Sequence, residues 1–282
     1  MTPTFLGGRP TEQPHATSLK RSKRMLAILA QLSESGSLSL ADLSEELGVS
    51  PATIRRDLAD LEDQRLLRRT HGGARVFDTD IELPVTLKDT QFREAKALIA
   101  RKTAQLIPTG KYVVALSGGT TTMEVARVLA TRHDLTIVTN SLTTATQIAA
   151  RPTLQVIMTG GAVRSHSFEL VGVLAENTFN AINVGTAVLG VDGITAESGA
   201  TTHDEIEART NHAMVTHAQR TIVVADGSKV GKVTLANVAT IAEIHDLVTD
   251  SSADPDELDA IQALGIRVHI AEERGAARGG VG

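Results

Sequence analysis

The sequence predicts an α/β protein of two parts, a small, mainly helical N-terminal domain and a larger domain built on a mostly parallel sheet. Residues 38–75 hold two closely spaced helical patterns, then a Gly-Gly turn between short extended arms. Beyond Phe92, short Val- and Ile-rich runs alternate with helical ones, which is typical of strands covered by helices on both faces. The 282 residues are enough for one small and one medium domain.

The N-terminal domain is expected over residues 18–76, after an arm of residues 1–17 that we expect to be disordered. Its first helix should span residues 19–34, where apolar side chains recur on one face; these are Met25, Ile28, Leu29 and Leu32. A helix-turn-helix follows at about residues 38–57. In its first helix Leu40, Leu43 and Leu47 form an apolar stripe, and Gly48 suits the left-handed conformation that often ends a helix.

The second helix of this pair has a clear start and a clear buried face. Ser50 is the expected N-cap and Pro51 the first turn. Ile54, Leu58 and Leu61 have the spacing of a buried stripe. In a helix-turn-helix the N-terminal residues of the second helix reach base edges in the major groove of DNA. Here the residues left exposed or flanking near that end are Ala52, Thr53, Arg55 and Arg56.

Residues 66–76 predict a basic hairpin beside this helix. From Gln64 to Arg75 there are four arginines and one histidine but no acidic residue, and Gly72-Gly73 supplies the turn. Such a hairpin is a wing, which can lie along phosphates or enter a minor groove. The predicted DNA-binding residues are Ser50, Ala52, Thr53, Arg55, Arg56, Arg68, Arg69 and His71.

The alternative for this segment is a solvated amphipathic helix pair, with the arginines as surface charge and Asp57 paired to a basic neighbour. The acid-free basic hairpin argues against it. The motifs TIRRDL (Thr53–Leu58) and LLRRTHGGA (Leu66–Ala74) resemble the N-terminal domain of the DeoR family of bacterial sugar-metabolism repressors. The resemblance implies a winged helix-turn-helix that binds operator DNA.

The composition of the chain indicates which kinds of protein and partner are expected. The chain has no cysteine, which excludes disulfides and suits a cytoplasmic protein. No run approaches the ~20 apolar residues of a membrane helix, so no membrane partner is expected. The net charge of −5 conceals an asymmetry, because residues 18–75 carry +2 and residues 76–282 carry −7. This distribution fits a chain in which only the basic N-terminal domain contacts DNA phosphates. Because the positive excess of that domain is small, we expect a homo-oligomer, in which two such domains double the DNA contacts.

We expect residues 77–91 to form a linker, residues 92–270 to form the α/β domain and residues 271–282 to form a mobile tail. Helices are expected between most of the strands, among them 123–130, 141–150 and 205–218. The predicted strands are Tyr112–Leu116, Leu135–Thr139, Leu154–Met158, Ala187–Val191, Thr221–Ala225, Asp246–Thr249 and Arg267–Ile270.

The loops after five of these strands carry small polar residues, and ligands of open α/β sheets bind at the carboxyl ends of the strands. The loop from Ser117 to Thr122 combines glycines, hydroxyls and a helix N-terminus, which suits a phosphate, although such residues also make ordinary strand-to-helix turns. It contains neither the GK[ST] of a nucleotide-triphosphate loop nor GxGxxG. The other candidates are Asn140 for a sugar hydroxyl, Gly160, Gly161 and Arg164 for a phosphate, and Asp192, Glu205 and Lys229. Each alone has a structural reading as a turn or solvated residue, but their convergence at one edge favours a small polyol phosphate.

This half also resembles the DeoR-type effector domain, through SGGTTTMEVA, VTNS, TGGAVR, ELVG, GVDGI, TTHDEIEA and VADGSK in that order. The resemblance covers about residues 19–270 and implies a domain similar to ribose-5-phosphate isomerase and glucosamine-6-phosphate deaminase that senses phosphorylated sugars. It implies that Ser117, Gly118, Gly119, Thr120 and Thr121 hold the phosphate while Asp192, Glu205 and Lys229 face the sugar. Many members have an acidic residue at Ser117 and a lysine at Asn211, so these departures bear on which ligand is bound.

Two functions follow as expectations. The first is a transcriptional repressor of sugar utilisation that a sugar phosphate relieves, with no cofactor, no metal and no catalytic residue. The second is a sugar-phosphate isomerase or deaminase, for which Asp192, Glu205, His203 and Lys229 could supply an acid–base pair. The helix-turn-helix favours the first, because an isomerase has no use for it. A purely architectural DNA-binding protein would leave the polar loops without a purpose.

Overall fold

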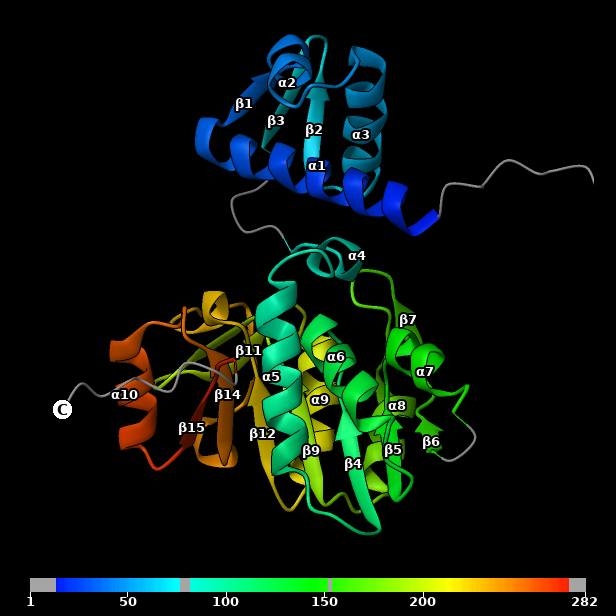
Figure 1. The fold of residues 1–282 in the computed structure, drawn as a ribbon, viewed down its shortest axis with the longest axis vertical. Helices are drawn as coiled ribbons and strands as arrows, with labels where there is room; N and C mark the ends of the chain where they lie inside the picture. Colours follow the sequence, from blue (N-terminus) through cyan, green and yellow to red (C-terminus); the bar gives the residue numbers. More distant parts are fainter. Residues whose placement is uncertain (1–13, 77–81, 152–153, 274–282) are drawn as a thin grey trace, which may run out of the picture. The chain divides into compact units, whose positions relative to one another are not determined.

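The computed structural model of the chain describes residues 14–76, 82–151 and 154–273, shown in Figure 1. The chain divides into two compact units, Met1–Gln91 and Phe92–Gly282. The expectations for residues 1–13, 77–81 and 274–282 lie outside the described residues.

The N-terminal unit is a set of helices on a small antiparallel sheet of order β1-β3-β2. Its core joins Ile28, Leu43, Ile54 and Leu61, which are all fully buried, so the predicted apolar stripes do face inward. The elements are α1 (Pro14–Ser35), β1 (Ser37–Ser39), α2 (Leu40–Glu46), α3 (Pro51–Asp63), β2 (Leu67–Thr70), β3 (Gly73–Val76) and α4 (Val85–Lys88).

Three boundaries differ from the prediction. Helix α1 begins at Pro14, so the expectation of an arm up to residue 17 is wrong for its last four residues. Helix α3 continues to Asp63, beyond the limit of about residue 57 given to the helix-turn-helix, and its predicted stripe residue Leu61 is buried. The predicted linker contains α4, whose Leu87 is buried in the core of the N-terminal unit.

The C-terminal unit is built on a seven-stranded parallel sheet, as the sequence predicts. Its order is β15-β14-β12-β9-β4-β5-β6, so the chain starts in the middle and winds outward in both directions. All seven predicted strands are present, with ends shifted by at most one residue. They are β4 (Tyr112–Leu116), β5 (Leu135–Thr139), β6 (Gln155–Met158), β9 (Thr186–Gly190), β12 (Thr221–Val224), β14 (Asp246–Asp250) and β15 (Arg267–Ala271).

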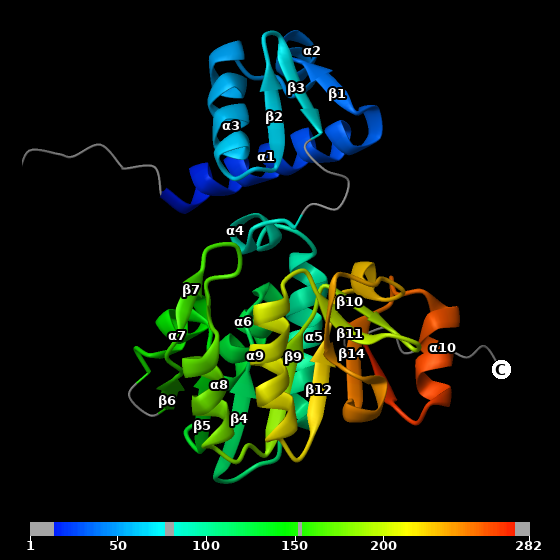
Figure 2. The same cartoon turned by 180° about the vertical axis from the view of Figure 1, so that it is seen from behind.

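Helices cover both faces of this sheet (Figures 1 and 2). Along β4 the side chains alternate, because Val114 and Leu116 pack into one core and Ala115 packs into the other. The first core is completed by α5 (Arg93–Leu106), α6 (Thr120–Leu129) and α7 (Leu142–Ile148). The second is completed by α8 (Val173–Asn180), α9 (Glu205–Thr216) and α10 (Pro255–Ala263).

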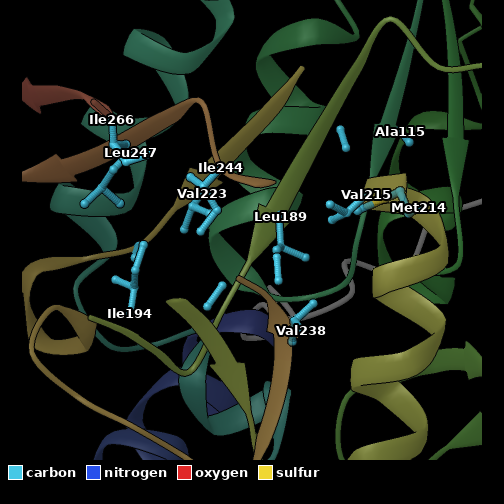
Figure 3. Close-up of a cluster of buried hydrophobic side chains, with 14 of the residues drawn as sticks. Ala115, Leu189, Ile194, Met214, Val215, Val223, Val238, Ile244, Leu247 and Ile266 are labelled. Atoms are coloured by element: carbon cyan, nitrogen blue, oxygen red, sulfur yellow. The ribbon is translucent and has the colours of Figure 1, made fainter. Parts of the chain in front are cut away.

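Two antiparallel additions lie outside the main sheet. One is the hairpin of β7 (Ala162–Arg164) and β8 (Glu169–Val171). The other is a three-stranded sheet of β10 (Gly193–Thr195), β11 (Gly199–Thr202) and β13 (Ala236–Ala239). Figure 3 shows Ile194 and Val238 of this small sheet in the same buried cluster as Leu189 and Val223 of the main sheet. No helix within the described ranges is long and apolar enough to cross a membrane.

Candidate functional site

The start of α3 presents the predicted reading surface. Ser50 caps the helix, because its hydroxyl accepts a hydrogen bond from the Thr53 backbone N–H at 3.2 Å. The Thr53 hydroxyl lies 3.0 Å from the Ser50 hydroxyl, and Thr53 is half-buried. Ala52, Arg55 and Arg56 are exposed while Ile54 between them is fully buried. The helix therefore offers two arginines and small side chains on its solvent side, the arrangement that fits a major groove.

The wing is fixed to the rest of its unit at the turn. A β-carbon at Gly73 would overlap the carbonyl oxygen of Leu38 in β1, so only glycine fits there. The Gly72 carbonyl accepts a hydrogen bond from the Leu40 N–H at 2.7 Å. Arg68, Arg69 and His71 are all exposed along this hairpin.

Arg69 of the wing forms an ion pair with Glu62 of α3. Its Nε lies 2.5 Å from Glu62 Oε2, and its backbone N–H donates to Glu62 Oε1 at 2.9 Å. The backbone and side-chain hydrogen bonds from Arg69 lower the pKa of Glu62, which keeps that carboxylate charged. The pair joins the wing to the recognition helix and offsets the charge of Arg69.

In the C-terminal unit the sheet order brings the predicted loops together. The five loops follow β4, β5, β6, β9 and β12, which are consecutive strands in the order β12-β9-β4-β5-β6. Because the strands are parallel, their carboxyl ends share one edge. The candidate residues of this edge therefore come from one continuous stretch of the sheet.

The central loop leads into α6 with its first backbone N–H groups free of side-chain caps. Gly119 is the N-cap residue at φ +107°, a conformation that L side chains rarely adopt, and none of the described side chains caps the helix. Thr120 and Thr121 are buried in its first turn. Ser117 is also fully buried, and its hydroxyl accepts the Gly190 N–H at 3.0 Å. Ser117 therefore fastens β4 to β9 instead of pointing outward.

A cluster of buried amides and a carboxyl lies beside this loop. Asn140 and Asn211 both donate their Nδ2 groups to Glu169 Oε2, at 2.9 Å and 3.1 Å. Asn140 Nδ2 also donates to Asn211 Oδ1 at 3.1 Å. Asn140 is completely buried, yet its Oδ1 has no hydrogen-bond partner among the described residues. A buried acceptor without a donor is costly, so this oxygen marks a place for a ligand or water hydroxyl.

Charged pairs surround the cluster. Arg164 binds Asp204 through Nε and Glu207 through Nη1, each at 3.1 Å. The other Glu207 oxygen accepts from the Thr202 hydroxyl at 2.8 Å. The second pair joins Lys229 Nζ to Asp192 Oδ1 at 3.4 Å, and Asp192 Oδ2 lies 3.2 Å from the same Thr202 hydroxyl, which can donate its one proton to either carboxylate. Burial raises the pKa of Glu207, and burial together with the charge of Glu207 raises that of Glu169.

Most of the predicted effector-site residues thus lie at the carboxyl edge of the sheet, whereas Glu205 does not reach the polar network. Glu205 is exposed, because Asp204 caps α9 and leaves the next residue on the outside of the first turn. Glu207 and Asn211, four residues apart on the inner face, reach the network instead.

Gly160 is exposed, whereas Gly161, at φ +135°, lies so close to the backbone of Val171 that a β-carbon would overlap it. Glu169 and Glu207 were not among the predicted site residues. The helical spacing of α9 could have indicated that Glu207 faces inward, but it says nothing of Glu169, which lies in β8. The described residues hold no group of three or more His, Asp or Glu side chains that could bind a metal ion.

Comparison with known proteins matches both units to one family. Residues 24–80 match the DeoR-like helix-turn-helix domain, and residues 91–251 match the DeoR C-terminal sensor domain. The chain is 37% identical over 248 residues to the HTH-type transcriptional regulator GlpR of Haloferax volcanii, covering 88% of this chain and 96% of that protein. It is 30% identical to the glycerol-3-phosphate regulon repressor of Escherichia coli K12, covering 87% and 96%.

Solved structures are more distant. A ribose 5-phosphate isomerase A from Methanocaldococcus jannaschii is 15% identical with a TM-score of 0.35, covering 49% of this chain and 54% of its own. The full-length sorbitol operon regulator SorC of Klebsiella pneumoniae is 12% identical with a TM-score of 0.33, covering 74% and 89%. The two domain matches and the relatives that share nearly their whole length with it identify this chain as a member of the DeoR family of transcription regulators.

Proposed function

We propose that this chain represses a sugar-utilisation operon by binding its operator through α3 and the β2–β3 wing, and that a phosphorylated sugar relieves the repression. The chain is a DNA-binding transcription regulator by family, as its relatives are. The observation that carries the effector half of the proposal is an uncapped helix start beside a buried, unpartnered Asn140 Oδ1. The first suits a phosphate and the second suits a hydroxyl.

The proposed contacts divide between the two parts of such a ligand. Phosphate oxygens would accept from backbone N–H groups at Gly119, Thr120 and Thr121, where the helix dipole adds positive potential. A sugar hydroxyl would donate to Asn140 Oδ1. Arg164 and Lys229 already have carboxylate partners, so we assign the phosphate to the helix start and not to these side chains.

The sugar-phosphate isomerase or deaminase alternative is not favoured. The relatives that match nearly the whole chain are named as regulators and repressors, and they include the transcriptional repressor AccR of Agrobacterium fabrum, 34% identical over 230 residues. Within the sensor, the pairing of Lys229 with Asp192 gives those side chains a structural task.

We also propose that the protein acts as a homo-oligomer on repeated half-sites. Residues 18–75 carry an excess of only two positive charges, which limits the phosphate attraction of one head. Two heads double the contacts and read a longer sequence. Light scattering at micromolar concentration tests this, because a monomer that still binds its operator tightly would contradict it.

The function is tested by selecting bound duplexes from a random-sequence library with the full chain. A recovered consensus should bind wild type tightly and Arg56→Ala more weakly by about 1–3 kcal/mol, as expected for a lost base contact. A panel of sugar phosphates added to that complex should contain one that releases the DNA. Selection without a consensus would contradict sequence-specific binding, and sustained turnover of a sugar phosphate would favour the enzyme.

A further inference from the structure

Glu169, a carboxyl group of the buried network, lies directly against the proposed phosphate cradle. It belongs to β8, in the hairpin whose backbone joins the loop after β5 through the Leu170 N–H and the Asn140 carbonyl, 2.7 Å apart. Glu169 as a residue is only 3% exposed. A β-carbon placed on Gly118 would overlap the Glu169 carboxyl group, with Oε1 as its nearest atom. Oε1 therefore lies beside the residue that precedes the N-cap of α6.

The two oxygens of this carboxyl have different surroundings. Oε2 accepts both amide bonds, from Asn140 and from Asn211. An oxygen that accepts two N–H groups is a poor place for a proton, so a proton on this carboxyl belongs on Oε1. That atom faces the loop in which an anionic ligand would sit.

A charged carboxylate at this position would oppose such a ligand. The attraction of a helix start for a phosphate comes from partial positive charge, and a full negative charge in contact with the same loop would offset it. Arg164, a cation whose charge acts on Glu169, is held by Asp204 and Glu207. A neutral carboxylic acid has the opposite effect, because it removes the repulsion and adds a hydrogen-bond donor.

We propose that Glu169 is a ligand-binding residue of the effector site that works as a neutral carboxylic acid, donating the proton on Oε1 to an anionic oxygen of the ligand. This rests on the proposed function and adds to it a contact and a linked proton. The site then selects ligands that present an acceptor oxygen next to Gly118.

The groups that face Glu169 are consistent with a neutral form. Burial raises its pKa well above the ordinary value for glutamate, and the charge of Glu207 from α9 raises it further. The amides of Asn211 and Asn140 and the charge of Arg164 from β7 act in the opposite direction without reversing the shift. Farther out, Asp204 is bound to Arg164, and Asp192 is bound to Lys229.

The test uses sulfate, a tetrahedral dianion whose charge stays constant through the neutral range, and follows the full-length protein by infrared spectroscopy and calorimetric titration. Wild type should show the carbonyl band of a protonated carboxylic acid at neutral pH. Sulfate should shift this band, because the acid gains a hydrogen-bond acceptor. The shifting band should disappear in Glu169→Gln and remain in Glu207→Gln, the matched control from the same network.

The affinity for sulfate should also depend on a neutral donor at position 169. Glu169→Gln keeps a neutral group of the same shape and should bind sulfate within a few-fold of wild type, whereas Glu169→Asp withdraws the carboxyl and should bind at least tenfold more weakly. As pH rises above the Glu169 pKa, wild-type affinity should fall by up to about tenfold per pH unit while Glu169→Gln stays constant. Melting curves establish that each variant is folded.

Two results would overturn the proposal. If sulfate binds but no protonated-carboxyl band responds to it, Glu169 is not the donor, and the proposed effector site stands without it. If wild type binds neither sulfate nor inorganic phosphate at any pH, the anion site at α6 fails as well, and the proposed function loses its effector half.

Discussion

Arg24 Nε lies 2.5 Å from Asp57 Oδ2, so the recognition helix α3 is tied to α1 through a carboxylate that is only 2% exposed. Arg21 Nε adds a second contact to Asp57 at 3.3 Å. Asp57 follows Arg55 and Arg56 directly, which places a buried anchor next to two exposed arginines. A basic partner for Asp57 was part of the solvated-helix alternative, but here the pairing orients the helix that carries the reading surface.

Replacing Asp57 with Asn should therefore loosen α3 from α1. The substitution keeps the shape but removes a charged hydrogen bond, and we expect a loss of about 2 kcal/mol in the free energy of unfolding of the N-terminal unit. Urea unfolding of the full chain measures it. Asp63→Asn, an exposed acid of the same helix, is the control and should change stability by less than about 0.5 kcal/mol. Equal effects of the two substitutions would show that the Arg24 contact is not an anchor.

The Glu62–Arg69 pair predicts a gain in DNA affinity from a mutation. Glu62→Gln removes the partner of Arg69 and frees its guanidinium for a phosphate. Binding to random-sequence duplex should strengthen several-fold, and the plot of log affinity against log salt should steepen by about one unit. Glu45→Gln, an exposed acid of α2, makes the same change in net charge. If both variants gain equally, net charge explains the effect and the ion pair does not restrain Arg69.

The amino ends of β14 and β15 contain an ion cluster that predicts acid sensitivity. Asp246 is fully buried and accepts from Arg220 Nε at 2.7 Å, Arg267 Nε at 2.9 Å and His269 Nε2 at 2.8 Å. Although burial acts to raise the pKa of Asp246, hydrogen bonds from Arg267, Arg220 and His269 hold it well below the ordinary value. A depressed pKa stabilises the fold above the unfolded value of about 4, and this contribution is lost as pH falls from there toward the folded value.

Asp246→Asn should consequently destabilise the C-terminal unit by about 3 kcal/mol near neutral pH, because it leaves the arginines without their shared partner. The difference from wild type should shrink as the pH is lowered below about 4. Thermal melts across that range measure it, with Asp259→Asn, an exposed acid of α10, as the control. A difference that is the same at every pH would mean that the carboxylate charge is not the source of the stability.

The features that local patterns encode were predictable. The strands of the main sheet are buried on both faces, so their Val- and Ile-rich runs stand out. Because the strands are parallel, the loops at their carboxyl ends were expected to share one edge, but their spatial order was not predicted. The inward acid of α9 was not identified, because the choice between Glu205 and Glu207 depends on Asp204 serving as the helix cap. The β7–β8 hairpin is too short to show a period, so periodicity did not indicate Glu169, although the ELVG motif begins with it. Helix α4 has only Val85 and Leu87 as buried residues, too few to distinguish four helical residues from a linker.

We expect the effector to act on DNA binding through the loop before α6, and the central glycine of this loop has a counterpart that serves as a control. Gly119 (φ +107°) is the N-cap residue of α6, and Gly172 (φ +91°) is that of α8. A β-carbon at either position meets no backbone atom, but valine there costs about 1–3 kcal/mol of strain for its positive φ. The two substitutions therefore cost similar stability and differ in whether they crowd the proposed phosphate cradle.

The effector can regulate only if it binds the DNA-competent and DNA-incompetent arrangements with different affinity. We expect the sugar phosphate to weaken operator binding of wild type by about 1–3 kcal/mol, and Gly172→Val to respond in the same way. Gly119→Val should bind the operator as wild type does but lose the response, because the valine side chain blocks approach of the phosphate to the N–H groups of α6. Operator titrations of the three proteins with and without the effector decide the matter. Equal responses in all three would mean that the loop from Ser117 to Thr122 is only a turn and that the phosphate binds elsewhere.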